Sequence, residues 1–503
     1  MTSSSKNGAS AALEIKTKDG VKFGKELREK EFLFGNGFLN LNHGSFGTFP
    51  RIVRDAMRTF QDECEAQPDP FIIYKYPQYL DLAREGMAKL LNTPSSTLVF
   101  VPNATTGINT VLRNIEFQPG DHILIFSTIY GACEKTVSLI TETTPAESVK
   151  IGYTFPVEDN WLLEEFEKKV KEVENKGGKV KIAIFDTVVS MPGVRMPFER
   201  LTQKCKELGV MSCIDGAHGV GHVEIDLGML DPDFFVSNCH KSVSSLFFIF
   251  ENPLTVRRWL HVPRGCAIFH VADRNQGVIR STLPTSHGFI PKGEKPVSPF
   301  PKRTFAQSHA QPGIEQNSSE QSAFTKSAFV DMEKPAFVAN FEFVGTIDNS
   351  PYLCVPTALK WRENIGGEDV IRNYCQTLVR RAAQHVAQIL GTEVMENSTG
   401  TLGRCCLSNV RLPISLPKVQ DVATKHGIDK EDVGIMVRDW MKKLSCEEYS
   451  TFIMIYWYGG VWWTRLSGQV YLEMKDFEWA AETLKDMCAR AEKGEWAVPK
   501  TKL

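Results

Sequence analysis

Residues Ser212–Lys241, which read SCIDGAHGVGHVEIDLGMLDPDFFVSNCHK, decide the fold of this chain. Asp215 closes the short apolar run Val210–Ile214, and the pair His240-Lys241 follows a second apolar run, Phe234–Cys239. Short apolar runs that alternate with helical segments are typical of buried parallel strands. In a doubly wound sheet the carboxyl ends of the strands face one crevice, where ligands bind. We therefore expect Asp215 and Lys241 to lie at the same edge of a parallel sheet.

A carboxylate and a lysine at neighbouring strand ends suit pyridoxal phosphate. The lysine can form a Schiff base with the aldehyde of the cofactor, and the carboxylate can hold the ring nitrogen protonated, which keeps the ring an electron sink. His218, three residues after Asp215, is placed to reach the phenolic oxygen of the ring. Taken singly, Asp215 is also typical of a helix N-cap, and Lys241 of an exposed residue after a strand. Their combination with a possible phosphate site upstream favours the cofactor.

The sequence on both sides of this segment alternates between short apolar runs and helical spacing. Apolar residues recur every three to four positions in Leu80–Leu91, as in an amphipathic helix. Alternation of this kind predicts an α/β fold with a mainly parallel sheet that helices cover on both faces. The other elements that we expect are strands at Leu98–Val101, His122–Phe126, Lys181–Phe185 and Ala267–Phe269, and helices at Gly107–Asn114, Glu134–Thr141, Leu162–Glu174 and Phe198–Leu208.

The composition is that of an ordinary globular protein. Of 503 residues, 42% are apolar and 23% are charged, and the formal net charge is −2. A balance this close to neutral argues against nucleic acid or an anionic membrane surface as a partner. No apolar run reaches the roughly 18 residues that a membrane-spanning helix needs. The 12 cysteines have the spacing of neither a metal site nor a disulfide framework, so we expect buried thiols, a reducing compartment and no metal.

We expect three parts along the chain. Residues 1–35 form a flexible N-terminal segment, 36–345 form a large cofactor-binding domain, and 346–503 form a smaller C-terminal α/β domain. Residues 291–322, rich in Pro, Ser, Gln and Lys, are predicted to be a long exposed loop. We expect a cytoplasmic location, with the nucleus as an alternative. Thr501-Lys502-Leu503 is a near match to the SKL peroxisomal signal, although a frayed tail is the simpler interpretation.

Two segments that each follow a predicted strand could bind the phosphate and the ring of the cofactor. Val101–Asn109, VPNATTGIN, opens a helix with Thr105 and Thr106, whose hydroxyls and backbone N–H groups suit a phosphate. Tyr130, in Ser127–Thr136, could stack on a flat ring. Alone, the first segment is more typical of a plain helix cap, and Tyr130 of a surface or core tyrosine.

Three further motifs could contact a substrate. Leu39–Thr48 (LNLNHGSFGT) and Phe341–Pro351 (FEFVGTIDNSP) are predicted to be tight loops, and each alone is typical of a surface turn. Arg465 lies within the apolar strand predicted in Trp462–Glu473. A buried guanidinium needs an anion, which is either a substrate carboxylate or a structural ion-pair partner. The residues alone leave both alternatives open.

Together these motifs resemble the fold-type I pyridoxal-phosphate enzymes, and within them the class V aminotransferase and cysteine-desulfurase group in its isopenicillin-N-epimerase-like branch. The resemblance extends from about Asn40 to Glu478 and is strongest to the fungal hercynylcysteine sulfoxide lyases, which perform the last, C–S-cleaving step of ergothioneine biosynthesis. Loline-type alkaloid enzymes are the nearest alternative. The segments that carry the resemblance are NHGSFGT, NATTGINTVLRNI, IYGAC, SMPGVR, DGAHGVG, DPDFFVSNCHK, PRGCAIF, IRSTLPTSHGF, NFEFVGTIDNSP and RLSGQVYLEM.

The resemblance implies a role for each matching residue. Lys241 would be the Schiff-base lysine, Asp215 would bind the pyridine nitrogen, and His218 would lie by the ring oxygen in place of the usual glutamine. The residue that matches Thr346 reaches the phosphate of the neighbouring subunit in relatives, which implies a homodimer with shared sites. The remaining roles would be phosphate binding by Ala104, Thr105, Asn238 and His240, ring stacking by Tyr130, carboxylate binding by Arg465, and contact with an amino-acid substrate by Asn42 and His43.

The chain departs from the family pattern directly after Lys241. A tryptophan follows the lysine at once in the family, whereas here Ser242–Arg258 comes before WLHVPRG. Without these 17 residues, which correspond to 51 nucleotides, the chain reads HKWLHVPRG. The codons expected at both boundaries fit splice junctions, so we hypothesise that the stretch translates a retained intron. The alternative is a real insertion, which would crowd the lysine with exposed phenylalanines.

The function that the resemblance implies is β-elimination from a cysteine-conjugate sulfoxide, hercynylcysteine sulfoxide, to a sulfenic acid, pyruvate and ammonia. The alternatives are another class V enzyme of fungal secondary metabolism, loline-type or epimerase-like, and an inactive product if the stretch after Lys241 is retained. A cysteine desulfurase would need a cysteine on a mobile loop. Cys405-Cys406 instead lies in TLGRCCLSNV, which is predicted to be a strand.

Overall fold

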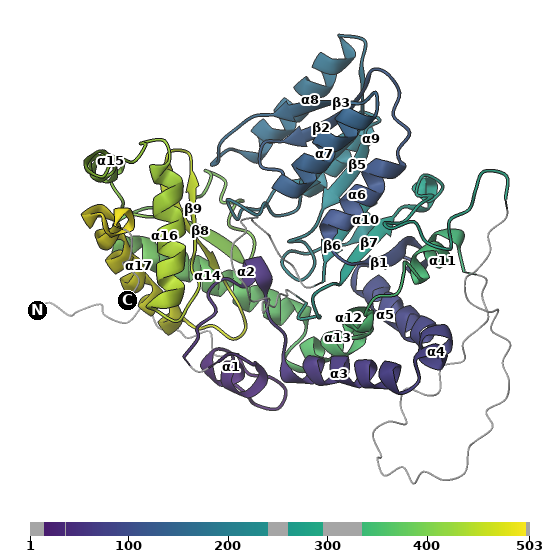
Figure 1. Ribbon diagram of the computed structural model, residues 1–503, viewed down its shortest axis with the longest axis horizontal. Helices are drawn as coiled ribbons and strands as arrows, with labels where there is room; N and C mark the ends of the chain where they lie inside the picture. Colours follow the sequence, from purple (N-terminus) through teal and green to yellow (C-terminus); the bar gives the residue numbers. More distant parts are fainter. Residues whose placement is uncertain (1–14, 36, 240–259, 295–333, 499–503) are drawn as a thin grey trace, which may run out of the picture.

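The computed structural model describes residues 15–35, 37–239, 260–294 and 334–498. A seven-stranded sheet has the order β1-β7-β6-β5-β4-β2-β3, and a three-stranded sheet has the order β8-β10-β9. Figure 1 shows the two sheets side by side, with the short helix α2 (His43–Phe46) between them. The strands are β1 Leu98–Val101, β2 Asp121–Phe126, β3 Glu147–Ile151, β4 Lys179–Asp186, β5 Met211–Asp215, β6 Phe234–Asn238, β7 Ala267–Val271, β8 Leu407–Arg411, β9 Met454–Tyr458 and β10 Val461–Ser467.

The large sheet is mainly parallel, as predicted. Strands β3, β2, β4, β5 and β6 run parallel, and only β7 runs antiparallel to its neighbours β6 and β1. Each strand expected in this sheet is present, with its ends within two residues of those expected. The edge strand β3 was not predicted, because its sequence ESVKI is polar and largely exposed and lacks the apolar run of a central strand. This topology confirms the α/β fold class.

Alternate residues of the central strands face two separate apolar layers. Ile182 and Ile184 of β4 belong to a core that also holds Ile108 of helix α6, whereas Ala183 and Phe185 belong to a core that also holds Phe166 of helix α8. Because strand side chains alternate between faces, helices must cover both sides of this sheet. Because these strands are parallel, their carboxyl ends lie at one edge of the sheet.

The helices account for most of the remaining chain, and the predicted helices all occur, with small shifts of their ends. Helix α6, for example, starts at Ala104, three residues before the expected start at Gly107. The segment Leu39–Thr48, expected to be a loop, contains the single turn of α2. The other helices are α1 Lys25–Glu31, α3 Arg51–Ala66, α4 Pro68–Pro70, α5 Tyr76–Leu90, α6 Ala104–Asn114, α7 Gly131–Thr143, α8 Asp159–Glu174, α9 Phe198–Glu207, α10 Leu227–Leu230, α11 Ala336–Glu342, α12 Ser350–Leu353, α13 Val355–Asn364, α14 Glu368–Leu390, α15 Leu416–Lys425, α16 Val433–Glu447 and α17 Met474–Lys493.

The small sheet is entirely antiparallel. Helices α14 and α16 pack on it, and α15 and α17 pack on these helices. Cys405 and Cys406 were expected to lie in a strand. They do not, because strand β8 begins after them, at Leu407. The N-terminal segment, predicted to be flexible, is packed in its described part. The Gly24 N–H donates to the Val470 carbonyl, and Arg28 pairs with Asp476 of α17 at 2.9 Å. Part of residues 1–35 therefore belongs to the folded C-terminal unit.

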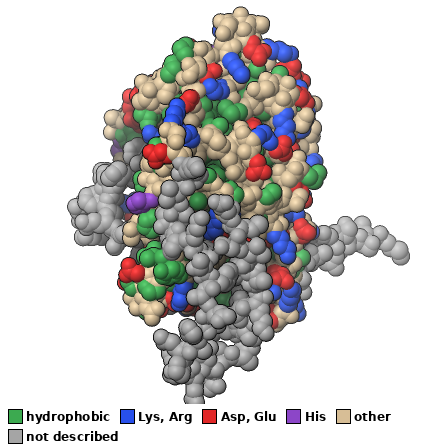
Figure 2. All heavy atoms as spheres, turned by 90° about the vertical axis from the view of Figure 1, so that its right-hand side faces the viewer, with side chains coloured by type: hydrophobic (Ala, Val, Ile, Leu, Met, Phe, Trp, Pro, Cys, Tyr) green, Lys and Arg blue, Asp and Glu red, His purple; other side chains and the backbone are tan. Residues whose placement is uncertain are grey.

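Charge is distributed evenly over the face shown in Figure 2. Lys, Arg, Asp and Glu side chains are interspersed over the described part of this face, in keeping with a net charge of −2. Among the described ranges, no helix is both long and apolar enough to cross a membrane. Within the same ranges, no three His, Cys, Asp or Glu side chains gather closely enough to hold a metal ion. All 12 cysteines are free thiols, most of them buried.

Candidate functional site

Asp215 is the last residue of β5 and is almost fully buried. Its Oδ1 accepts a hydrogen bond from the Ala217 N–H at 2.9 Å, and its Oδ2 lies 3.6 Å from the Cys133 thiol. Burial and the nearby Asp215 charge raise the pKa of the Cys133 thiol well above its usual value, so the thiol stays protonated and donates. Because Cys133 lies in the first turn of α7, the carboxylate sits against the start of that helix.

His218 lies close to this carboxylate in the chain, and Tyr130 comes near it through helix α7. Tyr130 is the half-buried N-cap residue of α7, one turn before Cys133. His218 is buried three residues after Asp215, with its ring centroid 5.9 Å from that of His222. The turn from Asp215 to His218 requires glycine, since a Cβ on Gly216 would lie 2.5 Å from the Phe235 ring. The structure thus brings Tyr130, Asp215 and His218 to the same edge of the sheet.

The N-terminus of α6 lies beside the carboxyl end of β6. The Ala104 N–H donates to Asn238 Oδ1 at 2.9 Å, and the Asn103 side chain caps the Thr106 N–H at 2.8 Å. Gly107 permits this approach, because a Cβ there would lie 2.6 Å from Val236 Cγ1. The sequence did not predict that the Ala104 N–H is already occupied. The groups that remain to meet a phosphate are the Thr105 N–H and hydroxyl and the Asn238 side-chain NH₂.

A loop after β4, residues 187–195, joins these groups to the small sheet. Thr187 directly follows Asp186, which is paired with Asp215 across the parallel strands. Among the described residues, the buried hydroxyls of Thr187 and Ser190 have no hydrogen-bond partner. Polar atoms buried in this way usually meet a ligand or water. Sequence reasoning assigned these two residues no role, although Ser190 opens the motif SMPGVR.

Arg465 of β10 is the most buried cation near this loop, with 1% of its surface exposed. Its Nη1 donates to the Ser190 carbonyl at 2.6 Å, and its Nη2 donates to Asn42 Oδ1 at 3.0 Å and Ser45 Oγ at 2.8 Å. No Asp or Glu of the described residues forms an ion pair with it, and its buried Nε has no partner there. Burial lowers the pKa of Arg465 to about 10. The guanidinium is therefore held by neutral oxygens, which resolves the sequence alternatives against a structural ion pair within these ranges.

His43 follows Asn42 at the start of α2 and is fully buried. Its Nδ1 lies 2.8 Å from the Tyr471 hydroxyl. The Gly44 N–H donates to Ser467 Oγ at 3.2 Å, and a Cβ on Gly44 would lie 3.3 Å from Arg465 Nη2. Asn42, His43 and Arg465, which the sequence placed 423 residues apart at their extremes, thus form one cluster.

Three predicted site residues are not brought into these clusters. His240, Lys241 and the stretch Ser242–Arg258 lie outside the described residues, as does Thr501-Lys502-Leu503. Thr346 is exposed in the loop between α11 and α12, and no contact in the described structure joins it to the other site residues of this chain. Most of the loop expected at 291–322 also lies outside the described residues.

The residues present fit pyridoxal phosphate. The α6 N-terminus and the Asn238 amide supply donors for a phosphate, and Asp215 supplies a buried carboxylate for the pyridine nitrogen. The buried Thr187 hydroxyl, which has no partner among the described residues, lies directly against the turn at 216–219, because a Cβ on Gly219 would lie 3.2 Å from Thr187 Oγ1. The site therefore has a carboxylate, Asp215, for the ring nitrogen and hydrogen-bond donors at the α6 N-terminus for the phosphate.

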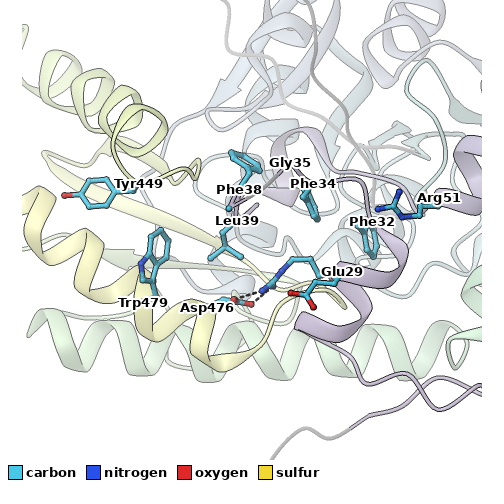
Figure 3. Close-up of a pocket in the computed structure, with 12 residues that line it drawn as sticks. Glu29, Phe32, Phe34, Gly35, Phe38, Leu39, Arg51, Tyr449, Asp476 and Trp479 are labelled. Atoms are coloured by element: carbon cyan, nitrogen blue, oxygen red, sulfur yellow. Dashed lines mark hydrogen bonds and ion pairs between the residues drawn. The ribbon is translucent and has the colours of Figure 1, made fainter.

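A separate pocket of about 590 Å³ lies between α1, the segment before α2, and α17. Figure 3 shows Phe32, Phe34, Phe38, Asp476 and Trp479 in its lining. Arg28, which also lines the pocket, donates to Asp476 at 2.9 Å. Its lining contains none of the predicted site residues. It is therefore distinct from the strand-end site, although Phe32 and Phe34 also contact Tyr471.

Comparisons with known proteins identify relatives of this chain. The family model for class-V aminotransferases matches residues 73–245. The chain is 36% identical to the L-cysteine desulfhydrase-like protein lolT1 of Epichloe uncinata, over 93% of this chain and 96% of that protein. It is 26% identical to the hercynylcysteine sulfoxide lyase of Schizosaccharomyces pombe, over 93% of this chain and 98% of that protein. It is 25% identical to isopenicillin N epimerase of Amycolatopsis lactamdurans, over 80% of this chain and 87% of that protein.

Solved structures show the same fold. The mutant of C-DES with glycine covalently linked to its pyridoxal-phosphate cofactor superposes with a TM-score of 0.62 at 14% identity, over 90% of this chain and 97% of that one. Apo cysteine desulfurase from Thermococcus onnurineus superposes with a TM-score of 0.59 at 14% identity, over 92% of this chain and 98% of that one.

The chain belongs to the class-V aminotransferase family of fold-type I enzymes. Its cofactor is pyridoxal phosphate, and within the family it is similar to carbon–sulfur lyases and cysteine desulfhydrases. These findings confirm the resemblance, the fold and the cofactor inferred from the motifs.

Proposed function

We propose that this chain is a carbon–sulfur lyase that cleaves the sulfoxide of a cysteine conjugate, with hercynylcysteine sulfoxide as its substrate. The observation that carries the proposal is Arg465, a fully buried guanidinium bonded to neutral oxygens beside the strand-end site. A buried cation of this kind is costly unless an anion joins it. The α-carboxylate of an amino acid is a planar anion that matches the guanidinium fork.

Each proposed residue then has one task. Asp215 holds the pyridine nitrogen, Tyr130 stacks on the ring, and His218 meets the ring oxygen. Thr105, Asn238 and His240 bind the phosphate, and Ala104, whose N–H is bonded to Asn238, holds that side chain at the helix start. Arg465 binds the substrate carboxylate, and Asn42 and His43 contact the amino acid. Bound pyridoxal phosphate supplies an electron sink that stabilises negative charge on the α-carbon. Lys241 Nζ removes the α-proton and returns it at a later step.

The overall reaction balances without an oxidant or reductant. The Cβ–S bond breaks with its electron pair on sulfur, and a proton makes the sulfenic acid. The three-carbon remainder takes up one water and gives pyruvate and ammonia. The sulfenic acid is then reduced outside this site.

We propose in addition a homodimer with shared sites. Thr346 is exposed and stands apart from the site residues of its own chain, which supports a role in a neighbouring subunit's phosphate site. Sedimentation or light scattering should then give twice the chain mass, and Thr346→Asp should weaken cofactor binding by charge repulsion.

A second candidate is a desulfhydrase-like or loline-type reaction on another cysteine derivative. The identity of 36% to lolT1, against 26% to the sulfoxide lyase, favours this alternative. A desulfurase that carries sulfur on Cys405 or Cys406 is not favoured, because both thiols are buried and burial raises their pKa values.

A pyruvate assay on hercynylcysteine sulfoxide, its unoxidised thioether and L-cysteine separates these candidates. The proposal expects fastest release from the sulfoxide, and roughly a thousandfold loss in Lys241→Ala. Fastest release from cysteine, with sulfide formed in equal amount, would support the second candidate. Holoenzyme that releases pyruvate from none of the three would refute both.

A further inference from the structure

The hydroxyl of Tyr471 lies at the centre of a short hydrogen-bond chain that ends on His43. Tyr471 is fully buried, and its oxygen lies 2.8 Å from His43 Nδ1 and 3.0 Å from Asn40 Nδ2. None of these contacts was foreseen from the sequence, although Tyr471 stands in the motif RLSGQVYLEM. The Asn40 NH₂ group only donates and a neutral histidine nitrogen without a proton only accepts, so the donor and the acceptor of each of these hydrogen bonds can be assigned.

The direction is set at Asn40. Its Oδ1 accepts the Asn42 backbone N–H at 3.2 Å, which places its NH₂ group toward Tyr471. The amide can only donate from that side, so the tyrosine oxygen accepts. Burial raises the pKa of Tyr471 well above its usual value, so its O–H proton is retained and must itself be donated. In the described part of the chain, the acceptor within reach is His43 Nδ1.

We propose that Tyr471 is a positioning residue that holds His43 in the tautomer with its proton on Nε2. A nitrogen that accepts a hydrogen bond carries no proton, so neutral His43 then has its N–H on the other side of the ring. His43 directly follows Asn42, whose Oδ1 accepts a hydrogen bond from Arg465 Nη2 at 3.0 Å, so the histidine belongs to the cluster around this guanidinium. We infer that its Nε2–H donates to an oxygen of the same anionic substrate. This last step rests on the proposed function, whereas the tautomer does not.

Tyr471 is held rigidly enough for this task. Its ring centroid lies 4.8 Å from that of Phe32 and 5.1 Å from that of Phe34, the two side chains that Figure 3 shows in the pocket wall. Its backbone carbonyl accepts a hydrogen bond from Arg28 Nη1 at 2.7 Å, and Arg28 is itself paired with Asp476. A preset donor of this kind fixes a tautomer better than a mobile one.

A second histidine near His43 also accepts a hydrogen bond at Nδ1 from a buried side chain. Arg362 Nη1 lies 3.3 Å from His261 Nδ1, and a guanidinium has donors only, so His261 Nδ1 accepts. The rings of His43 and His261 are 5.4 Å apart. Both histidines thus carry the proton on Nε2 when neutral, which gives the first experiment an internal standard.

The first test reads the tautomer without activity. Apoprotein labelled with ¹⁵N in its histidines is examined by NMR at a pH where His43 is neutral, and His43→Gln identifies the His43 signals. We expect the shift of a bare nitrogen at Nδ1 in the wild type, as for His261, and a mixture of tautomers in Tyr471→Phe. Asn40→Ala, which removes the donor that orients the tyrosine, is the second variant if Tyr471→Phe is insoluble. A proton on Nδ1 in the wild type would overturn the proposal.

The second test uses replacements that imitate one nitrogen at a time. The amide of glutamine can place an N–H near Nε2, and that of asparagine near Nδ1. We expect His43→Gln to keep kcat/KM within roughly tenfold of the wild type and His43→Asn to lose roughly a hundredfold. Tyr471→Phe should cost roughly tenfold in the wild-type background but less than about twofold when combined with His43→Gln, because its partner is then gone.

Equal losses from Tyr471→Phe in both backgrounds would show a merely structural role and would overturn the positioning role. Failure of the proposed function has a different signature, since it leaves every variant inactive on the tested substrates while the NMR tautomer is unchanged.

Discussion

The Leu260 N–H donates a hydrogen bond to the Cys239 carbonyl at 3.3 Å, although the 20 residues 240–259 lie between them in sequence. In a chain without Ser242–Arg258, Leu260 would follow Cys239 by four positions. The same contact would then be the bond of a single helical turn, from N–H to the carbonyl four residues earlier. The family match ends at residue 245, inside this stretch. The two ends therefore already have the spacing that the shorter chain needs.

We predict that a protein lacking Ser242–Arg258 folds, turns yellow with pyridoxal phosphate and releases pyruvate faster than the full chain. The reason is that the shorter chain connects β6 to Leu260 without extra residues beside Lys241. Absorbance of the bound cofactor and the pyruvate assay measure the two effects. Deletion of residues 300–316, of equal length, is the matched control and should not raise activity. A full chain at least as active as the shortened one would contradict the prediction, and transcript sequencing would test the intron directly.

Asn238 should orient the helix terminus and bind the phosphate through different atoms. Asn238→Asp keeps an oxygen for the Ala104 N–H but replaces the NH₂ donor with a negative charge. We expect the cofactor Kd to rise roughly a hundredfold in this variant and roughly tenfold in Asn238→Ala, because charge repulsion exceeds the loss of a neutral hydrogen bond. Titration of apoprotein with pyridoxal phosphate measures both. Tighter binding in Asn238→Asp than in Asn238→Ala would show that the side chain serves only Ala104.

Arg465→Met should lower activity and not lower stability. The substrate loses its anion partner, so kcat/KM should fall roughly a hundredfold or more. The unliganded protein loses a buried charge without a carboxylate partner, so its free energy of unfolding should stay equal or rise by about 1 kcal/mol. Chemical unfolding and the pyruvate assay measure the two. Arg411→Met, on β8, is the control, since its exposed pair with Glu393 contributes little. A marked loss of stability in Arg465→Met would point to a structural charge instead.

His270 of β7 should make the fold sensitive to mild acid. Burial lowers its pKa from 6.5 to about 4. Between these values the unfolded chain binds a proton that the folded protein does not, so stability falls as pH falls from 6.5 and the loss levels off below 4. From pH 7 to pH 5 this group alone should cost about 2 kcal/mol. The difference between wild type and His270→Phe, in unfolding experiments at the two pH values, isolates it. Parallel pH dependence in both proteins would contradict the assignment.

The sequence predicted the elements of the large sheet because buried strands and amphipathic helices leave periodic patterns in single segments. It missed β3, whose polar residues carry no such pattern, and it extended β8 over Cys405 and Cys406 because apolar residues continue before the strand. The motif VPNATTGIN showed that a phosphate could bind at α6. It could not show that Asn238, 134 residues away, occupies the Ala104 N–H.

By itself, the order of residues determined the α/β class, the family and the cofactor, since strand-end Asp215 and Lys241 and the helix start at Ala104 are local patterns. Only the tertiary structure decided which groups are paired. It showed that Arg465 is bonded to Ser190, Asn42 and Ser45, and that the Tyr471 hydroxyl lies 2.8 Å from His43 Nδ1. The physical reason is that burial and hydrogen bonding depend on contacts between segments hundreds of residues apart, and the state of a buried charge or proton depends on those contacts.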